Sequence, residues 1–335
     1  MLKNKMFIFF PSLILGTLMA ISASSWFTAW MGLEINLMSM TPIIINKINF
    51  LTVEASIKYF LIQAMSSLIL IFSSFLSYTS QKWGFLLSFD NMYFMSLSLK
   101  AGIAPLHFWF PQVIMCSNWI QCMVMLTWQK IAPFILMSYL NSKLMSAFII
   151  SSALIGTLGG MNQINIKMIL VYSSIINSAW MLSLSSTNEI FWWMYFLSYT
   201  FMTFSASYVF IKISIEKISS LHKMSLPSLA KIVFLMNFLS LAGLPPFLGF
   251  FIKIMAINML MENNMNLLTI IILITTSILS FYFYLRTSYS SLFINETSLS
   301  IKSMVETTVY LKIIFLLSMF SSLGILMIPP LTLLT

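Results

Sequence analysis

Residues 229–262 read LAKIVFLMNFLSLAGLPPFLGFFIKIMAINMLME and are the clearest indication of the fold. This stretch is almost entirely apolar, and about 20 apolar residues are enough for one helix to cross a membrane. The run is therefore too long for one straight transmembrane helix. Near its middle, Gly243-Leu244-Pro245-Pro246 removes two backbone N–H donors, because proline has none. These residues predict two half-helices that meet inside the membrane.

The rest of the chain has the composition of a membrane protein. Of its 335 residues, 59% are hydrophobic and 7% are charged, and the mean hydropathy is +0.95. Soluble domains carry about 25% charged residues, so this chain has too few to cover a soluble globule with polar groups. Its long, continuous apolar runs are also unlike the alternating strands of a membrane barrel. The sequence predicts an all-α polytopic membrane protein.

Apolar windows predict about eleven transmembrane helices. Residues 86–106 end in Gly102-Ile103-Ala104-Pro105 and continue to Pro111, so this span should be broken as well. Broken helices persist in lipid where the freed backbone groups are buried in protein or line a wet cavity, which favours a transport path over the alternative of a packing kink. The expected spans are residues 6–24, 26–45, 56–78, 86–106, 119–140, 145–161, 166–184, 189–213, 229–262, 266–288 and 308–330.

The sequence offers little for a cofactor, a metal or a nucleic acid. Two cysteines, Cys116 and Cys122, are too few for an iron–sulfur cluster, and His107 and His222 give no clear haem ligand pair. No glycine-rich nucleotide loop follows a strand. The net charge of +9 is spread along the chain, which favours lipid headgroups over nucleic acid. We expect no redox centre in this chain.

The basic residues predict the orientation of the chain. With eleven spans, the side of the N-terminus carries Lys3, Lys5, Lys47, Lys167, Lys217, Lys223 and Lys302, and the other side carries little beyond Lys82 and Lys143. By the positive-inside rule, the N-terminus faces the matrix or cytoplasm and the C-terminus the opposite compartment. A single arginine among 17 basic residues, with 28 Met and 30 Phe, hints at an organellar gene with A/T-rich codons. No transit peptide is evident before the first span.

Four ionisable residues fall near the middle of predicted spans: Glu34, Lys100, Lys130 and Lys253. A charge at that depth costs several kcal/mol, so four of them predict a polar row through the membrane interior. Burial disfavours the charged form of a lysine, and a nearby carboxylate favours it, so a lysine with a movable acidic partner is a switchable proton site. We expect Glu34 and Lys100 to lie within about 8 Å of each other, inside the bundle.

Two further interpretations stay open. His107 lies seven residues after Lys100 and beyond the helix break; it could pass protons near neutral pH or be a satisfied core histidine. The whole row could instead be structural, with buried Glu–Lys pairs that fix the helix register. Glu54 and Lys58, spaced four residues apart on a helix, should form a surface pair.

Six motifs, in order along residues 26–253, resemble those of the antiporter-like subunits of respiratory complex I. They are WMGLEIN (30–36), KAGIAPLHFWFP (100–111), WQKIAP (128–133), GGMNQ (159–163), YSSI (172–175) and LAGLPPFLGF (241–250). The resemblance implies one transmembrane domain over residues 1–335, with inverted five-helix repeats at about 1–140 and 145–288, each with one broken helix. A C-terminal helix at about 308–330 would follow. It also implies a hydrated charged axis at mid-membrane and an N-terminus in the matrix.

The resemblance also implies roles for single residues. Glu34 and Lys100 would be the acid–lysine pair, Lys130 the central lysine and Lys253 the lysine on the exit side. The chain departs from the family at Ile252, where proline is usual before the last lysine, and at Asn177, where histidine is common. Lys167 likewise replaces an Arg-Lys pair. The change at residue 252 puts the helix geometry around Lys253 in question.

The function implied is that of a proton-translocating core membrane subunit of NADH:ubiquinone oxidoreductase, which conducts or relays protons and is driven by quinone chemistry elsewhere in the complex. NADH, FMN, iron–sulfur clusters and ubiquinone would belong to other subunits. The implied partners are other membrane-arm subunits and phospholipids such as cardiolipin, with no nucleic acid, in the mitochondrial inner membrane. A free-standing cation/proton antiporter and a purely structural membrane spacer are the alternatives.

Overall fold

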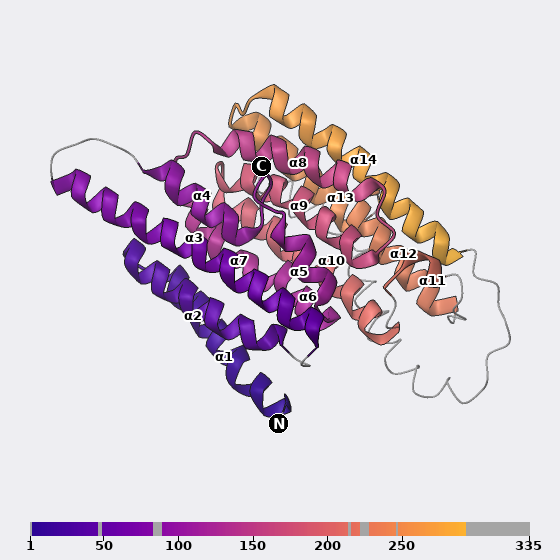
Figure 1. Cartoon of the computed structure of the whole chain (residues 1–335). Helices are drawn as coiled ribbons and strands as arrows, with labels where there is room; N and C mark the ends of the chain where they lie inside the picture. Colours follow the sequence, from indigo (N-terminus) through magenta and orange to yellow (C-terminus); the bar gives the residue numbers. More distant parts are fainter. Residues whose placement is uncertain are drawn as a thin grey trace. The chain divides into compact units, whose positions relative to one another are not determined.

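The computed structural model describes residues 2–45, 49–82, 89–213, 216–221, 228–245 and 247–292 (Figure 1). Within these ranges, the regular structure consists of α-helices and one isolated β-bridge, between Asn165 and Lys217. The prediction of an all-α fold is therefore confirmed for the described residues. The predicted helix at 308–330 and His222 lie outside the described residues. The chain divides into two compact units, residues 1–155 and 156–335, which are described separately here.

The first unit is a bundle of apolar helices. Helix α1 packs along α2, α2 packs against α3, and α7 contacts both α1 and α4. Helix α3 has 33 residues and is longer than the predicted span 56–78, which gives it a length of about 50 Å. The helices of this unit are α1 (Leu2–Ile21), α2 (Trp26–Ile44), α3 (Phe50–Lys82), α4 (Asp90–Ala101), α5 (Trp109–Cys116), α6 (Trp119–Leu126), α7 (Trp128–Ser138) and the start of α8 (Met145–Met161).

Glycines allow the close contact between α1 and α2. A Cβ atom on Gly32 would lie 2.5 Å from the backbone nitrogen of Ala20, and one on Gly16 would lie 2.8 Å from that of Asn36. Small residues at such contacts let two helix backbones approach closely, as is common between membrane helices. This contact fixes α2, the helix that carries Glu34.

In the second unit, α10 lies against α9, α12 and α13, and α14 packs on α12 and α9. Helix α9 is the most enclosed of the membrane-length helices in the described chain, since 89% of its most apolar stretch is buried. The helices of this unit are the end of α8, α9 (Ile166–Ser185), α10 (Glu189–Ile213), α11 (Ile218–Leu221), α12 (Ser228–Ala242), α13 (Leu248–Glu262) and α14 (Leu267–Leu292).

Two helices end at the glycines singled out in the sequence. Helix α4 ends at Ala101 and is followed by Gly102, with φ of 68°, whereas α12 ends at Ala242 and is followed by Gly243, with φ of 80°. Glycine adopts this left-handed conformation without a steric penalty, which makes it the usual residue after the end of a helix. Helical geometry resumes at Trp109 and at Leu248 respectively.

The predicted span 119–140 is interrupted in a way that the sequence did not suggest. Helices α6 and α7 meet at Thr127, whose φ and ψ of −117° and −74° depart from helical values. Its hydroxyl donates to the carbonyl of Met123 at 2.7 Å, and such a bond from threonine to the preceding turn often bends a helix. Lys130 therefore lies in the first turn of α7.

Five helical stretches of the described chain are long and apolar enough to cross a membrane. They are residues 50–80, 119–138 (α6 and α7 together), 166–185, 189–211 and 267–289. Residues 8–21 and 145–161 form shorter apolar helices. Helices α4, α5, α12 and α13 are short because the chain leaves helical geometry after Ala101 and Ala242. The total of eleven spans stays a prediction.

Candidate functional site

Lys100 is enclosed in the first unit, in the last turn of α4. Its side chain is 6% exposed, and its Nζ atom has no hydrogen-bond partner among the described residues. Glu34, half-buried on α2, lies near enough for its charge to act on this ammonium group. An electrostatic interaction therefore joins the two residues, although their predicted separation stays a prediction.

Side chains from two other helices fix the end of α4. The Nε2 atom of Gln63 donates to the carbonyl of Lys100 at 3.2 Å, and the indole Nε1 of Trp109 donates to that of Leu99 at 3.1 Å. The last carbonyls of a helix have no partner within the helix, so these donors satisfy them. Trp109 belongs to the motif at residues 100–111, whereas nothing in the sequence pointed to Gln63.

Lys130 is also buried, with 2% of its surface exposed. Its Nζ atom lies 5.6 Å from the centroid of the Phe110 ring. The neighbouring Gln129 donates from Nε2 to Oδ1 of Asn36 at 2.8 Å, which links α7 to the helix that carries Glu34. Asn36 lies in the motif at residues 30–36 and Gln129 in the motif at residues 128–133, but the contact between them depends on how the helices pack.

Lys253 lies on α13 in the second unit and turns towards the end of α12. Its Nζ atom donates to the carbonyl of Ala242, the last residue of α12, at 3.2 Å. A cation is stabilised there, because the carbonyl end of a helix carries a partial negative charge. A Cβ atom on Gly243 would lie 3.1 Å from this Nζ atom, so the glycine leaves room for the ammonium group.

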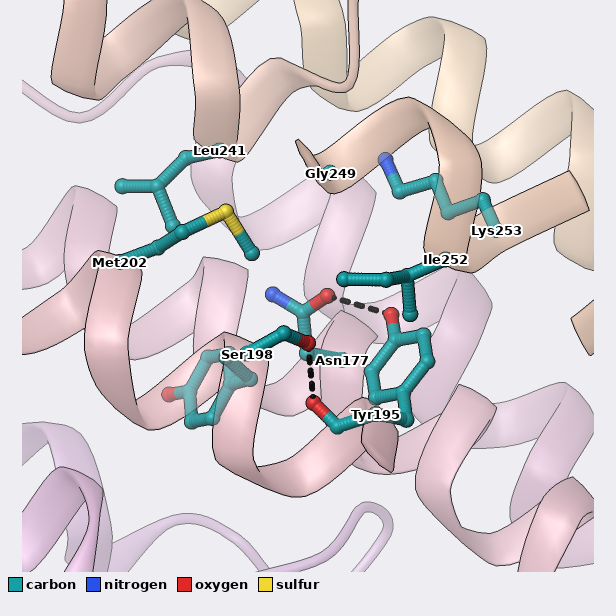
Figure 2. Close-up of a pocket in the computed structure, with 9 residues that line it drawn as sticks. Asn177, Tyr195, Ser198, Met202, Leu241, Gly249, Ile252 and Lys253 are labelled. Carbon is teal, nitrogen blue, oxygen red and sulfur yellow. Dashed lines mark hydrogen bonds between the residues drawn. The ribbon is translucent and has the colours of Figure 1, made fainter. Parts of the chain in front are cut away.

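A small cavity adjoins Lys253 and is shown in Figure 2. The cavity volume is about 10 Å³, which is enough for about one water molecule. Asn177 and Ile252, two of the three departures from the family pattern, line the cavity together with Tyr195. The hydroxyl of Tyr195 donates to Oδ1 of Asn177 at 2.8 Å, and Nδ2 of Asn177 donates to the carbonyl of Ser173 at 2.9 Å. The Asn177 amide thus makes a hydrogen bond through its oxygen and another through its nitrogen, at the position where the family resemblance implies histidine.

Replacing Tyr195 with phenylalanine should lower the stability of the second unit. The change removes the donor to Asn177 and leaves its half-buried Oδ1 atom without this bond, which costs about 1 kcal/mol. We expect a lower unfolding temperature of the purified protein, measured by differential scanning fluorimetry. Tyr282→Phe is the control because Tyr282 is 56% exposed. Equal effects of the two changes would contradict a structural role for the bond between Tyr195 and Asn177.

His107 is 5% exposed, and its contacts are local. Its Nδ1 atom lies 3.3 Å from the carbonyl of Pro105, and its ring centroid lies 4.7 Å from that of Phe108. These contacts hold the imidazole within the segment between α4 and α5. Neither contact joins it to one of the lysines, so a relay role for His107 stays a prediction.

Among the described residues, two salt bridges lie away from the four predicted site residues: one was expected from the sequence and the other was not. Glu54 and Lys58 form the expected surface pair at 2.7 Å, and each side chain is 40% exposed. Lys167 was grouped with the basic residues on the side of the N-terminus, but its side chain is 6% exposed and lies 2.7 Å from Oε1 of Glu216. This pair joins the start of α9 to the segment before α11.

Across the described ranges, no three His, Cys, Asp or Glu side chains gather as a metal site would require.

Residues 23–280 match the family described as NADH:quinone oxidoreductase/Mrp antiporter, transmembrane. The chain is 42% identical over 297 residues to a protein of Anopheles gambiae named NADH-ubiquinone oxidoreductase chain 2, and the match covers 86% of each chain. It is 33% identical over 336 residues to the protein of the same name from Locusta migratoria, with 97% of each chain covered.

Two solved structures share this fold at low sequence identity. A chain of respiratory complex I from Thermus thermophilus has a TM-score of 0.82 and 22% identity, with 98% of this chain and 79% of that chain covered. A chain of the Mrp complex from Dietzia sp. has a TM-score of 0.78 and 14% identity, with coverages of 96% and 74%. The fold is thus that of the antiporter-like membrane subunits. The chain belongs to the NADH:quinone oxidoreductase/Mrp antiporter family, among the NADH-ubiquinone oxidoreductase chain 2 proteins.

Proposed function

We propose that this chain is a proton-translocating core membrane subunit of NADH:ubiquinone oxidoreductase in the mitochondrial inner membrane. The observation that carries the proposal is the enclosure of two lysines in apolar helices: Lys100 is 6% and Lys130 is 2% exposed. Lysines at lipid-facing positions near helix ends extend their ammonium groups to the headgroups instead. Keeping two of them inside costs free energy, which favours a functional use of their charge.

The proposed mechanism is a switch between charged and neutral lysines. When Glu34 is close, its carboxylate favours the charged form of Lys100, and that charge repels a second proton on Lys130. When the carboxylate withdraws, burial favours neutral Lys100, and Lys130 can take up a proton. Helices α4 and α7, which carry the two lysines, are in contact. The proton would continue to Lys253, and His107 would act as an additional relay.

The ends of α4 and α12 support the proposed pair of broken helices in inverted repeats. Each helix ends with Ala-Gly in the same backbone conformation, and each end lies beside an axis lysine: Lys100 in the last turn of α4, and Lys253 bonded to the last carbonyl of α12. Half-helix ends of this kind bind cations and line transport paths in membrane proteins. The repeats would cover residues 1–140 and 145–288 of one transmembrane domain, with a further helix at 308–330.

The N-terminus would face the matrix and the C-terminus the intermembrane space. The partners would be neighbouring membrane-arm subunits and phospholipids such as cardiolipin. NADH, FMN, iron–sulfur clusters and ubiquinone would bind to other subunits, so this chain would contribute proton transfer and no redox centre.

A double-mutant cycle on Glu34 and Lys100 tests the proposal. We expect Glu34→Gln and Lys100→Met each to lower NADH-driven proton translocation by about tenfold, with the double variant no worse than the lower single variant, because residues that act as a unit are not additive. The measurement is proton uptake by the assembled complex in proteoliposomes, together with the rate of NADH oxidation.

The exposed pair Glu54 and Lys58 provides the matched control, with the same residue types and the same substitutions. Glu54→Gln and Lys58→Met should leave translocation unchanged. A native gel would separate the alternatives: a free-standing antiporter would not migrate with NADH dehydrogenase activity. Normal translocation by both axis variants within an assembled complex would contradict the proposed function and favour a structural spacer.

A further inference from the structure

The ammonium group of Lys130 lies over the aromatic ring of Phe110. Phe110 is 2% exposed, and its centroid lies 5.6 Å from Nζ. This distance falls within the range, up to about 6 Å, in which the negative face of an aromatic ring attracts a cation. The attraction is stronger in a site without water, because few solvent dipoles screen it.

The same ring is in contact with the end of the Lys100 helix. A Cβ atom on Gly102, the residue after α4, would lie 3.2 Å from both Cβ and Cγ of Phe110. The backbone nitrogen of Phe110 also donates to the carbonyl of His107 at 2.9 Å, which fixes the start of α5. Phe110 therefore contacts both the turn after α4, at Gly102, and the ammonium group of Lys130 on α7. A shift of the Gly102 turn would move the ring relative to Lys130.

We infer that Phe110 is a positioning residue that couples the end of the Lys100 helix to the charged form of Lys130. An apolar ring adds attraction for a cation without adding a second titrating group, so Lys130 can be charged in one step and neutral in the next. A carboxylate in the same place would hold the proton more tightly. The inference rests on the proposed function, since it assigns a second role within the same row of lysines.

The test compares ring-free and ring-containing variants of the assembled complex in proteoliposomes. Phe110→Leu removes the ring, Phe110→Met is a second ring-free change of similar bulk, and Phe110→Tyr keeps the ring face. We expect the ring-free variants to lower NADH-driven proton translocation by about two- to fivefold. The tyrosine variant should restore most of the activity. Assembly is followed on native gels, so that translocation is compared only between assembled complexes.

The decisive measurement is the same change in a Lys130→Met background. If Phe110 acts through Lys130, Phe110→Leu should cause no further loss there, because the ring has no cation to attract. An equal further loss in that background, or equal losses for the leucine and tyrosine variants, would show a packing role and overturn the inference. Full translocation by both ring-free variants would overturn it as well. If Lys130→Met alone translocates protons normally, it is the proposed function that fails.

Discussion

Lys130→Met is expected to lower NADH-driven proton translocation by about tenfold or more, because it removes a titrating group from the proposed proton path. Methionine retains much of the length and the apolar bulk of lysine, so the packing of α7 should be preserved. Removal of a buried charge also lowers the cost of placing this helix in lipid. The complex should therefore assemble normally. The measurement is proton uptake per NADH oxidised in proteoliposomes, alongside a native gel.

The control for this variant is Lys58→Met, which makes the same substitution at a lysine that is 40% exposed and paired with Glu54. Its translocation should equal that of the unchanged chain. Normal translocation by an assembled Lys130→Met complex would reject a relay role for Lys130. Failure to assemble would instead indicate that Lys130 is a packing residue, which is the structural alternative for the whole row.

Gly249→Ala is expected to prevent most of the chain from assembling, as judged by the amount of complex on a native gel. Gly249 lies in the first turn of α13, and a Cβ atom there would overlap the carbonyl oxygen of Ser240 on α12. The nearest atoms, which belong to Ser240 and Gly243, are all backbone atoms, so relief requires α12 and α13 to move apart. Such a shift would also remove the hydrogen bond between Lys253 and Ala242.

Gly160→Ala is the matched control for this second prediction. A Cβ atom on Gly160 would lie 3.2 Å from the ring of Phe283 and 3.3 Å from Cβ of Tyr172, and both neighbours are side-chain atoms. Because side chains adjust by a few tenths of an ångström more easily than backbone, we expect near-normal assembly. If the two alanine variants reduced the amount of assembled complex equally, the close backbone contact at Gly249 would not be the cause of the loss.

The class of the fold and the ends of α4 and α12 could be predicted from the sequence alone. Apolar runs of membrane length with few charges predict helices, since the backbone must satisfy its own hydrogen bonds in lipid. Glycine and proline at residues 102–105 and 243–246 predict the ends of α4 and α12, because local backbone chemistry decides where a helix stops. The order of six motifs indicated the family, and the charges at Glu34, Lys100, Lys130 and Lys253 indicated the candidate site.

Which side chains meet could not be predicted in this way, because it depends on the packing of the folded chain. The ring of Phe110 at Lys130, the amide of Gln63 at the carbonyl of Lys100, and the hydroxyl of Tyr195 at Asn177 join residues on different helices. The partner of Lys167, Glu216, lies 49 positions away along the chain. Periodicity predicts that a helix forms, but these contacts depend on how each helix is rotated and how closely it packs. That packing results from the fit of many side chains at once, which no single stretch of sequence specifies.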